Sequence, residues 1–307
     1  MIEVQDLTKT FNGKPVLNGI SFHVKKGEIF GYLGPNGAGK TTTMKILLGL
    51  LKPESGSALV FGEALGDNGD LRRRVGVLLE NAGLYERLSA YENLNYYAQL
   101  YHASHIDERI KNLLDFVGLS DRQNDRVGEF SKGMKRRLAL ARSIIHDPDV
   151  LFYDEPSAGL DPEAQKLVRD LILHLAREKG RTIFLNSHDL DEVQRVCSKI
   201  AIVQKGEVKA YDTIENLRKK SSRPAVEIVL ADDKEAEKAL DLLKSLDYVS
   251  ECERDGLRIT AIVEGEKTST ILGVLMKDGI RVEEAKKVAK VLEEIYLTIV
   301  RQSEGKT

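Results

Sequence analysis

A glycine-rich turn between an apolar run and a helical stretch constrains this chain more than any other feature. Residues 34–41 read GPNGAGKT and fit the pattern G-x-x-x-x-G-K-[ST]. Glycines let the backbone curl so that successive N–H groups point at phosphate oxygens, which side chains would block. We therefore expect a phosphate-binding loop, with Lys40 reaching the β- and γ-phosphates of a nucleotide and the Thr41 hydroxyl binding Mg²⁺. The motif alone does not separate kinases, GTPases and ATPases.

A pair of acidic residues, Asp154 and Glu155, follows the apolar run VLFY. A residue at the carboxyl end of a buried parallel strand faces the ligand crevice, so we expect Asp154 to hold Mg²⁺ through water. Glu155 leaves the strand one residue later and is placed to polarise an attacking water, the general-base role in γ-phosphate hydrolysis. An isolated DE pair is more often a solvated loop, but the preceding apolar residues and the upstream phosphate loop favour the catalytic interpretation.

Two further polar side chains follow apolar runs. His188 ends the run RTIFLNSH, and Glu80 ends the run RRVGVLLE. A lone histidine is usually structural or on the surface. Because this one ends a strand beside the expected site, we favour a contact with the γ-phosphate or the attacking water. We expect Glu80 to contact Mg²⁺ or the same water.

A helix start lies in the segment FSKGMKRRLALARSII, residues 130–145. Ser131 and Gly133 stand just before apolar residues at helical spacing. The first turn of a helix has unpaired N–H groups, and its dipole favours negative charge. The sequence therefore predicts an anion-binding helix start here and leaves open whose anion it binds.

The order of apolar runs and helical stretches predicts two domains. Residues 1–215 alternate short β-rich runs with helices, which is typical of an α/β domain around a largely parallel sheet. A charged, polar segment ending in Pro224 marks a change in composition, and we expect a linker over residues 216–223. Residues 224–307 read as βαββαβ with an added helix, which predicts a small ferredoxin-like α+β domain.

Charge, cysteines and hydropathy exclude several classes of protein. The chain has 46 Lys and Arg against 48 Asp and Glu, so no global field recruits nucleic acid or a membrane surface. Cys197 and Cys252 form no C-x-x-C pair, and we expect reduced thiols in a cytosolic protein. The N-terminus does not read as a signal peptide, and no run approaches the roughly 18 apolar residues of a membrane span. Any work at a membrane would need a partner that crosses it.

These pieces in this order resemble the ATP-binding cassette (ABC) ATPases over residues 2–215, including a helical subdomain over about residues 81–145. The resemblance implies that ATP and Mg²⁺ are bound and that residues 157–161 form a dimer-contact loop. The ATP-binding residues it implies are Phe11, Gly34, Pro35, Asn36, Gly37, Ala38, Gly39, Lys40, Thr41, Thr42, Ser131 and Gly133. The catalytic set is Lys40, Glu155 and His188, and the metal set is Thr41, Glu80 and Asp154. Phe11 would stack on adenine, although such an aromatic residue is equally often in the core.

The chain departs from the family pattern at two places. The family signature L-S-G-G-Q appears here as FSKGM, residues 130–134, which keeps Ser131 and Gly133 for phosphate contacts. The family's loop glutamine appears as Glu80, which keeps an oxygen ligand for Mg²⁺ but adds a negative charge near the γ-phosphate.

The resemblance also implies partners. In this family the signature caps the γ-phosphate bound by a second subunit, which implies an ATP-bound head-to-tail homodimer or cassette heterodimer. The helical subdomain receives a coupling helix from an integral membrane permease, which implies a peripheral place on the cytoplasmic face of the cell membrane. Half of the ten tyrosines lie between residues 80 and 130. Tyrosines suit a docking surface, but many pack inside a domain, and we expect only some to be exposed.

The C-terminal ending LEEIYLTIV, after a small α/β appendage, is similar to single-cassette ATPases of drug, antibiotic or sodium export systems. We therefore expect an ATPase that powers export. The alternative is a soluble ABC ATPase acting on the ribosome or nucleic acid. Such proteins usually carry two cassettes or a long coiled-coil insertion, neither of which is evident in this sequence, and the near-neutral charge argues against nucleic acid. A small-molecule kinase is disfavoured by the Ser-x-Gly helix start followed closely by YDEPSAGLD.

Overall fold

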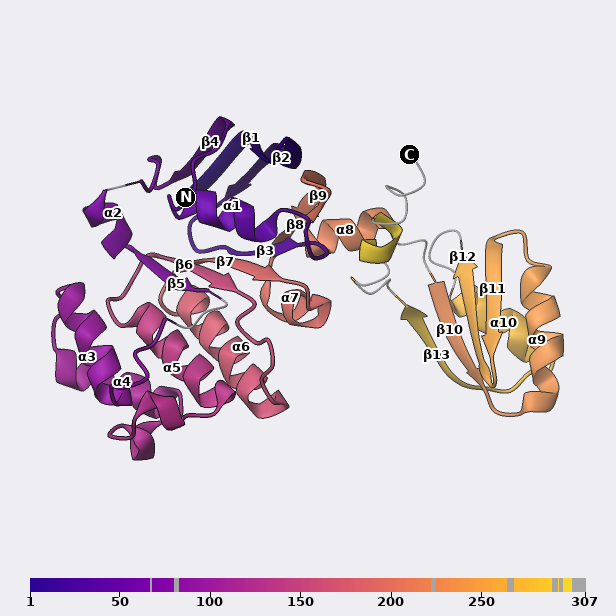
Figure 1. Ribbon diagram of the computed structural model, residues 1–307. Helices are drawn as coiled ribbons and strands as arrows, with labels where there is room; N and C mark the ends of the chain where they lie inside the picture. Colours follow the sequence, from indigo (N-terminus) through magenta and orange to yellow (C-terminus); the bar gives the residue numbers. More distant parts are fainter. Residues whose placement is uncertain are drawn as a thin grey trace. The chain divides into compact units, whose positions relative to one another are not determined.

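The computed structural model divides into two compact units, which are described separately (Figure 1). It describes residues 1–66, 68–79, 83–221, 225–263, 268–288, 292 and 295–299. The first unit contains Met1–Ile214 and the second Glu215–Thr298.

Of the segment expected as a linker, residues 216–223, the described residues 216–221 are helical. Helix α8 spans Ile214–Ser221. Ile214 and Leu217 are buried and lie three residues apart, so they share one face of this helix. Their burial explains why a segment whose composition is mostly charged still forms regular structure.

A central sheet, six-stranded within the described residues, organises the first unit. Its order is β5-β6-β7-β3-β8-β9, and it is parallel except where β9 pairs with β8. The strands are β3 (Ile29–Leu33), β5 (Val75–Leu78), β6 (Val150–Asp154), β7 (Thr182–Ser187), β8 (Lys199–Gln204) and β9 (Glu207–Thr213). Strands β3, β6 and β7 are buried along their whole length, as expected where helices or a second sheet cover both faces.

A smaller antiparallel sheet, ordered β2-β1-β4, packs over the central one. Its strands are β1 (Ile2–Phe11), β2 (Lys14–Val24) and β4 (Ser55–Val60). Helix α1 (Lys40–Leu47) lies between the two sheets (Figure 1). Phe22 of β2 stacks on Phe30 of β3 with ring centroids 5.3 Å apart, so the two sheets share one apolar core.

The other helices of this unit complete the fold. They are α2 (Gly69–Arg73), α3 (Ala90–Leu100), α4 (Ile106–Phe116), α5 (Lys132–Ile144), α6 (Pro162–Arg177) and α7 (Leu190–Val196). Helices α3, α4 and α5 bury a cluster of their own, including Leu94, Ile110 and Leu138. The expected helix start is confirmed, because Ser131 is the N-cap of α5 and its Oγ accepts a hydrogen bond from Met134 N at 3.2 Å.

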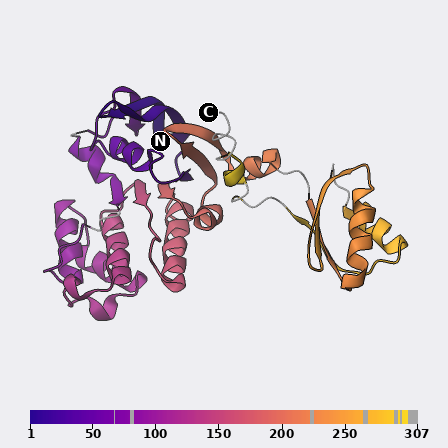
Figure 2. The same cartoon turned by 45° about the vertical axis from the view of Figure 1, so that its right-hand side comes forward.

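The second unit has the ferredoxin-like architecture that the order of its elements predicts. Its elements are β10 (Ala225–Leu230), α9 (Ala236–Lys244), β11 (Val249–Asp255), β12 (Arg258–Val263), α10 (Thr268–Lys277) and β13 (Val282–Val288). The sheet is antiparallel in the order β11-β12-β10-β13, and both helices lie on one face of it (Figure 2). Of the helix expected over residues 290–302, the described residues 292 and 295–299 are helical.

Among the residues that the structure describes, no helix has the length and apolar character to cross a membrane.

Replacing Gly76 by alanine tests how α5 packs against β5. An added Cβ would lie 2.2 Å from the Ser143 carbonyl oxygen and 2.6 Å from Leu151 Cδ2. We expect Gly76→Ala to lower the free energy of unfolding by roughly 1–3 kcal/mol, measured by urea denaturation. Gly69→Ala is the control, because its Cβ would meet nothing within 4 Å, and it should change stability by less than about 1 kcal/mol. Equal losses in the two variants would contradict this packing.

Candidate active site

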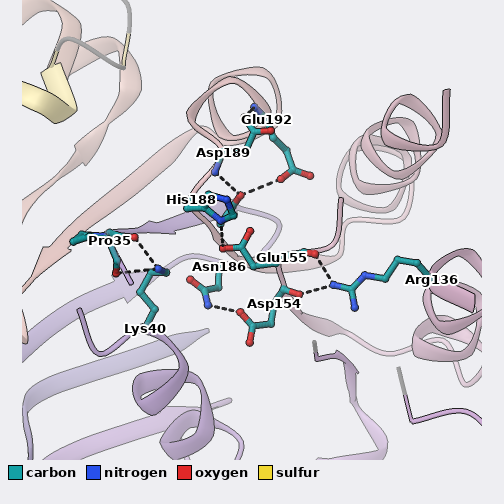
Figure 3. Close-up of polar contacts among 11 residues, drawn as sticks. Pro35, Lys40, Arg136, Asp154, Glu155, Asn186, His188, Asp189 and Glu192 are labelled. Atoms are coloured by element: carbon teal, nitrogen blue, oxygen red, sulfur yellow. Dashed lines mark hydrogen bonds and ion pairs between the residues drawn. The ribbon is translucent and has the colours of Figure 1, made fainter. Parts of the chain in front are cut away.

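The phosphate loop between β3 and α1 is shaped by glycines and closed by a lysine. A Cβ on Gly34 would lie 2.2 Å from the Val203 carbonyl oxygen, and Gly39 has φ of +100°, so neither position admits a side chain without strain. The buried Lys40 donates from Nζ to the carbonyl oxygens of Gly34 at 2.7 Å and Pro35 at 3.2 Å (Figure 3). Burial lowers the pKa of Lys40 from its ordinary value, while the charges of Glu155 and Asp154 act in the opposite direction. The amine is therefore held inside the loop.

Two of the three threonines that follow Lys40, Thr41 and Thr43, have different surroundings. Thr41 is exposed and lines the same cavity as Lys40. Thr43 is buried, and its hydroxyl donates to Gly39 O at 3.1 Å and lies 3.1 Å from the Tyr32 hydroxyl. Thr41 is thus the hydroxyl presented to a ligand, while Thr43 anchors the helix start.

The acid pair lies where β6 ends. Asp154 is buried, and Asn186 Nδ2 donates to its Oδ1 (Figure 3). Glu155 N donates to Asn186 O at 2.8 Å, so the two neighbouring strands are joined at their carboxyl ends. Glu155 itself has φ of 50°, a left-handed conformation that turns the chain out of the strand.

His188 follows β7 and contacts the second acid. Its Nδ1 lies 2.7 Å from Glu155 Oε1 (Figure 3). The side chain of His188 is 66% exposed and that of Glu155 is 22% exposed, so the histidine covers the carboxylate from the solvent side. This contact fixes the direction in which the carboxylate points.

One cavity of about 530 Å³ brings most of these residues together. It is lined by Asn36, Lys40, Thr41, Lys132, Lys135, Arg136, Asp154, Glu155, Ala158, Asn186 and His188. The predicted cluster of a lysine, a threonine, two acids and a histidine therefore converges at one place. Two lysines from the first turns of α5, Lys132 and Lys135, also line it, and Lys135 Nζ forms an ion pair with Glu86 Oε1 at 2.6 Å.

Other predicted site residues lie elsewhere. Phe11 is at the end of β1 and is 44% exposed. Ser131 is exposed and Gly133 half-buried at the start of α5, and within the described residues neither lines the cavity. Glu80 lies outside the residues that the structure describes.

Sequence reasoning missed Arg136, which joins α5 to the acid pair. Its Nη2 donates to the carbonyl oxygens of Asp154 at 2.6 Å and Glu155 at 2.5 Å (Figure 3). Its Nε donates to Pro156 O at 3.1 Å, and its Nη1 to Leu79 O at 2.7 Å. In the run KRRLALARS this side chain reads as part of a basic helix face, so the local pattern holds no signal for its role.

Glu192 is a second residue that the sequence did not indicate. Its carboxylate accepts hydrogen bonds from Ser157 Oγ and, at 3.1 Å, from Ser187 Oγ. Burial raises the pKa of Glu192, and the two hydroxyl donors oppose that shift. One carboxyl group thus links the loop after the acid pair to the strand end that precedes His188.

Comparisons with known proteins agree on the kind of protein that the chain resembles. A family model described as ABC transporter matches residues 17–158. The chain is 34% identical to the ABC transporter ATP-binding protein YhcH of Bacillus subtilis, covering 99% of this chain and 97% of that protein. It is 42% identical to a fluoroquinolones export ATP-binding protein of Mycobacterium tuberculosis, covering 74% and 76%. A solved ATP-binding subunit of an ABC transporter has a TM-score of 0.66 and 32% identity, covering 72% of this chain and 92% of that one.

Replacing Arg136 by lysine tests the junction between α5 and the acid pair. A lysine cannot bind the several carbonyl groups at once, so buried carbonyl oxygens lose their donors. We expect Arg136→Lys to lower the free energy of unfolding by roughly 2–4 kcal/mol, measured by urea denaturation. Arg122→Lys, at an exposed ion pair with Asp125, should cost under about 0.5 kcal/mol. A loss at Arg136 as small as that of this control would show that these hydrogen bonds do not stabilise the junction.

Proposed function

The chain belongs to the family of ABC transporter ATP-binding proteins, and from this premise we propose that it powers export through a separate integral membrane permease. As a member of this family it is an ATPase. The observation that supports ATP hydrolysis in this proposal is the cavity at which Lys40, Glu155 and His188 meet. The mycobacterial relative, whose name describes fluoroquinolone export, supports export as the direction of transport.

ATP would occupy the phosphate loop and the adjoining cavity. Its β- and γ-phosphate oxygens would replace the carbonyl groups that now accept from Lys40, and residues 36–42 would supply backbone N–H groups. The Asp154 carboxylate and the Thr41 hydroxyl are oxygen donors, which suit Mg²⁺, and Asp154 is held in place by Asn186. Bound there, Mg²⁺ would neutralise charge on the phosphates. Glu80 stays a predicted ligand outside the described residues.

Hydrolysis would use the pair of Glu155 and His188. The Glu155 carboxylate would accept a proton from a water whose oxygen attacks the γ-phosphorus, while the bond to the bridging oxygen breaks and ADP leaves. His188 is a positioning residue in this scheme, because its Nδ1 lies 2.7 Å from Glu155 Oε1 and orients the carboxylate. Lys40 would stabilise the charge that develops on the transferred phosphoryl group.

The exposed start of α5 would bind the γ-phosphate held by a second cassette. Its N-terminal N–H groups and dipole attract anions, and Ser131 and Gly133 stand at this end of the helix. Two cassettes, as a homodimer or a heterodimer, would enclose two ATP molecules head to tail. Loss of the γ-phosphate after hydrolysis would remove the charge that bridges them. Phe11, exposed at the end of β1, is available to stack on adenine.

A tyrosine-rich surface of the helical subdomain would dock the permease. As expected, only some tyrosines are exposed: Tyr85 and Tyr96 are, whereas Tyr97 and Tyr101 are half-buried. Tyr97 lies with its ring centroid 6.1 Å from that of Tyr85 and 5.4 Å from that of Tyr96. A hollow of about 390 Å³ beside them is lined partly by Tyr97, Tyr101 and Arg142. A helix of the permease lying here would place the chain peripherally on the cytoplasmic face of the cell membrane.

Glu155→Gln tests the general base. The amide cannot accept the proton, so ATP turnover should fall roughly 10²- to 10⁴-fold while ATP binding is retained. Phosphate release and calorimetric titration with ATP measure the two quantities. Glu163→Gln, an exposed change in the first turn of α6, should leave both unchanged. Unaltered turnover in Glu155→Gln would exclude this residue as the base.

Ser131→Arg tests the site shared between two cassettes. In the Glu155→Gln background, ATP enclosed between two cassettes should remain bound through rapid desalting in the presence of Mg²⁺. An arginine at the helix start would prevent the two cassettes from closing around ATP, so the amount of retained ATP should fall at least about tenfold. The affinity of the phosphate loop of a single cassette for ATP should be unchanged. Asn124→Arg, at an exposed position of the same subdomain, should retain ATP normally. Equal retention of ATP in both variants would argue against binding of the second cassette's γ-phosphate by residues 130–134.

A further inference from the structure

Strand β13 is a sheet edge with an unusual order of charges. Among the described residues it pairs only with β10, at the end of the order β11-β12-β10-β13. We propose that β13 pairs with the β13 of a second copy of this chain, so that two C-terminal units form one continuous antiparallel sheet without nucleotide. This inference goes beyond the proposed function, because it concerns a different unit and does not need ATP.

The charges of β13 are complementary to their own reversed order. The strand reads VEEAKKV over Val282–Val288. When two copies run antiparallel about a two-fold axis at Ala285, Glu283 lies opposite the partner's Lys287 and Glu284 lies opposite the partner's Lys286. Every charged position then faces the opposite charge, which stabilises a cross-strand pair. An isologous contact of this kind closes on itself and gives a dimer rather than a fibre.

Other pairings of the same strand are less favourable. A parallel pair in register would place Glu opposite Glu and Lys opposite Lys. A shift of two residues in the antiparallel pair would place either Glu284 or Lys286 opposite its own copy. Charged residues on an edge strand usually discourage pairing, and here they discourage all but a narrow set of registers. Among these pairings, the sequence of charges favours the arrangement centred on Ala285.

The opposite edge of the sheet does not share this property. Strand β11 pairs only with β12 among the described residues, and it reads VSECERD over Val249–Asp255. An antiparallel self-pair centred on Cys252 would place Glu251 opposite the partner's Glu253. Like charges opposite one another destabilise such a pair. The two edges thus differ, and only β13 suits a second copy.

The backbone of β13 is regular from Glu284 onward, and Glu283 lies at an irregularity in its register with β10. Its register with β10 is continuous from Glu284 to Val288, and the shift falls before Glu284. Lys286 Nζ lies 2.8 Å from Glu227 Oε1 on β10, and Arg258 Nη1 of β12 lies 3.1 Å from Glu227 Oε2. These ion pairs connect three adjacent strands across the sheet and keep its edge in place.

An apolar hollow lies beside β13 and would be covered in the pair. It measures about 530 Å³ and is lined partly by Leu272, Met276, Ile280, Val282 and Ala285. Met276 of α10 is 69% exposed. Apolar surface of this kind at a sheet edge marks a contact site, and a second copy would bury the same surface on both chains. Charge selects the register, and the hollow contributes apolar area.

Joining two chains in this way would affect the cassettes. Two cassettes joined through their second units meet at an effective concentration that depends on the length and stiffness of the chain between the units, not on the protein concentration in solution. The proposal therefore favours two identical cassettes in one assembly, and it predicts a dimer of the full chain in the absence of ATP.

The dissociation constant of the nucleotide-free full chain, from analytical ultracentrifugation, is the first test. Glu283→Lys with Glu284→Lys turns every charged cross-strand contact into a like pair and should weaken the dimer on the order of a hundredfold. Lys286→Glu with Lys287→Glu should do the same. Mixing the two variants restores all opposite pairs and should recover a mixed dimer. Thermal unfolding shows whether each variant folds. If the second variant does not fold, the dissociation constant of the first variant alone decides the test.

Ala285→Cys tests the register directly. Two cysteines at the two-fold axis would face each other, so oxidation should give a disulfide-linked dimer that reductant separates. Ser245→Cys, at the end of α9, and the unaltered chain with Cys197 and Cys252 are the controls, and neither should cross-link comparably. A monomer at tens of micromolar without nucleotide, or a dimer indifferent to charge reversal, would overturn the proposal. Dimerisation only with ATP would overturn it while leaving the proposed ATPase cycle intact.

Discussion

The guanidinium of Arg136 is the contact on which the geometry of the first unit depends. It donates to Asp154 O at 2.6 Å and to Leu79 O at 2.7 Å, and so joins α5 to two adjacent strand ends of the central sheet. A charged donor that satisfies buried carbonyl oxygens contributes more than a neutral one, and its loss leaves those oxygens without donors. The start of α5 and the acid pair are therefore kept at a fixed spacing within one chain.

A second set of contacts extends this fixed geometry to the side of the histidine. Glu192 accepts from Ser157, in the loop after the acid pair, and from Ser187, just before His188. Its burial raises its pKa, which is the cost of placing a carboxyl group there. Arg136 and Glu192 together hold the two chain segments that carry Glu155 and His188. Hydrogen bonds to neighbouring elements thus set the positions of the segments that carry these two side chains.

What the sequence predicted was local, and what it missed was distant along the chain. The phosphate loop, the acid pair and the cap at Ser131 each depend on a few consecutive residues, so they can be recognised from the sequence alone. The βαββαβ order likewise limits the topologies open to the second unit. Arg136, by contrast, binds a carbonyl 57 residues away, and Asn186 binds Asp154 across 32 residues. Such pairs become visible only when the strands are placed side by side.

The left-handed turn at Glu155 has an evolutionary consequence. Its φ of 50° places a side chain in a backbone region that costs roughly 1–2 kcal/mol and that glycine or asparagine adopts with less strain. Folding alone would therefore prefer a different residue here. Under the proposed role of Glu155 as general base, a duplicated gene that no longer needs ATP turnover should lose this glutamate before it loses the apolar strand that leads to it.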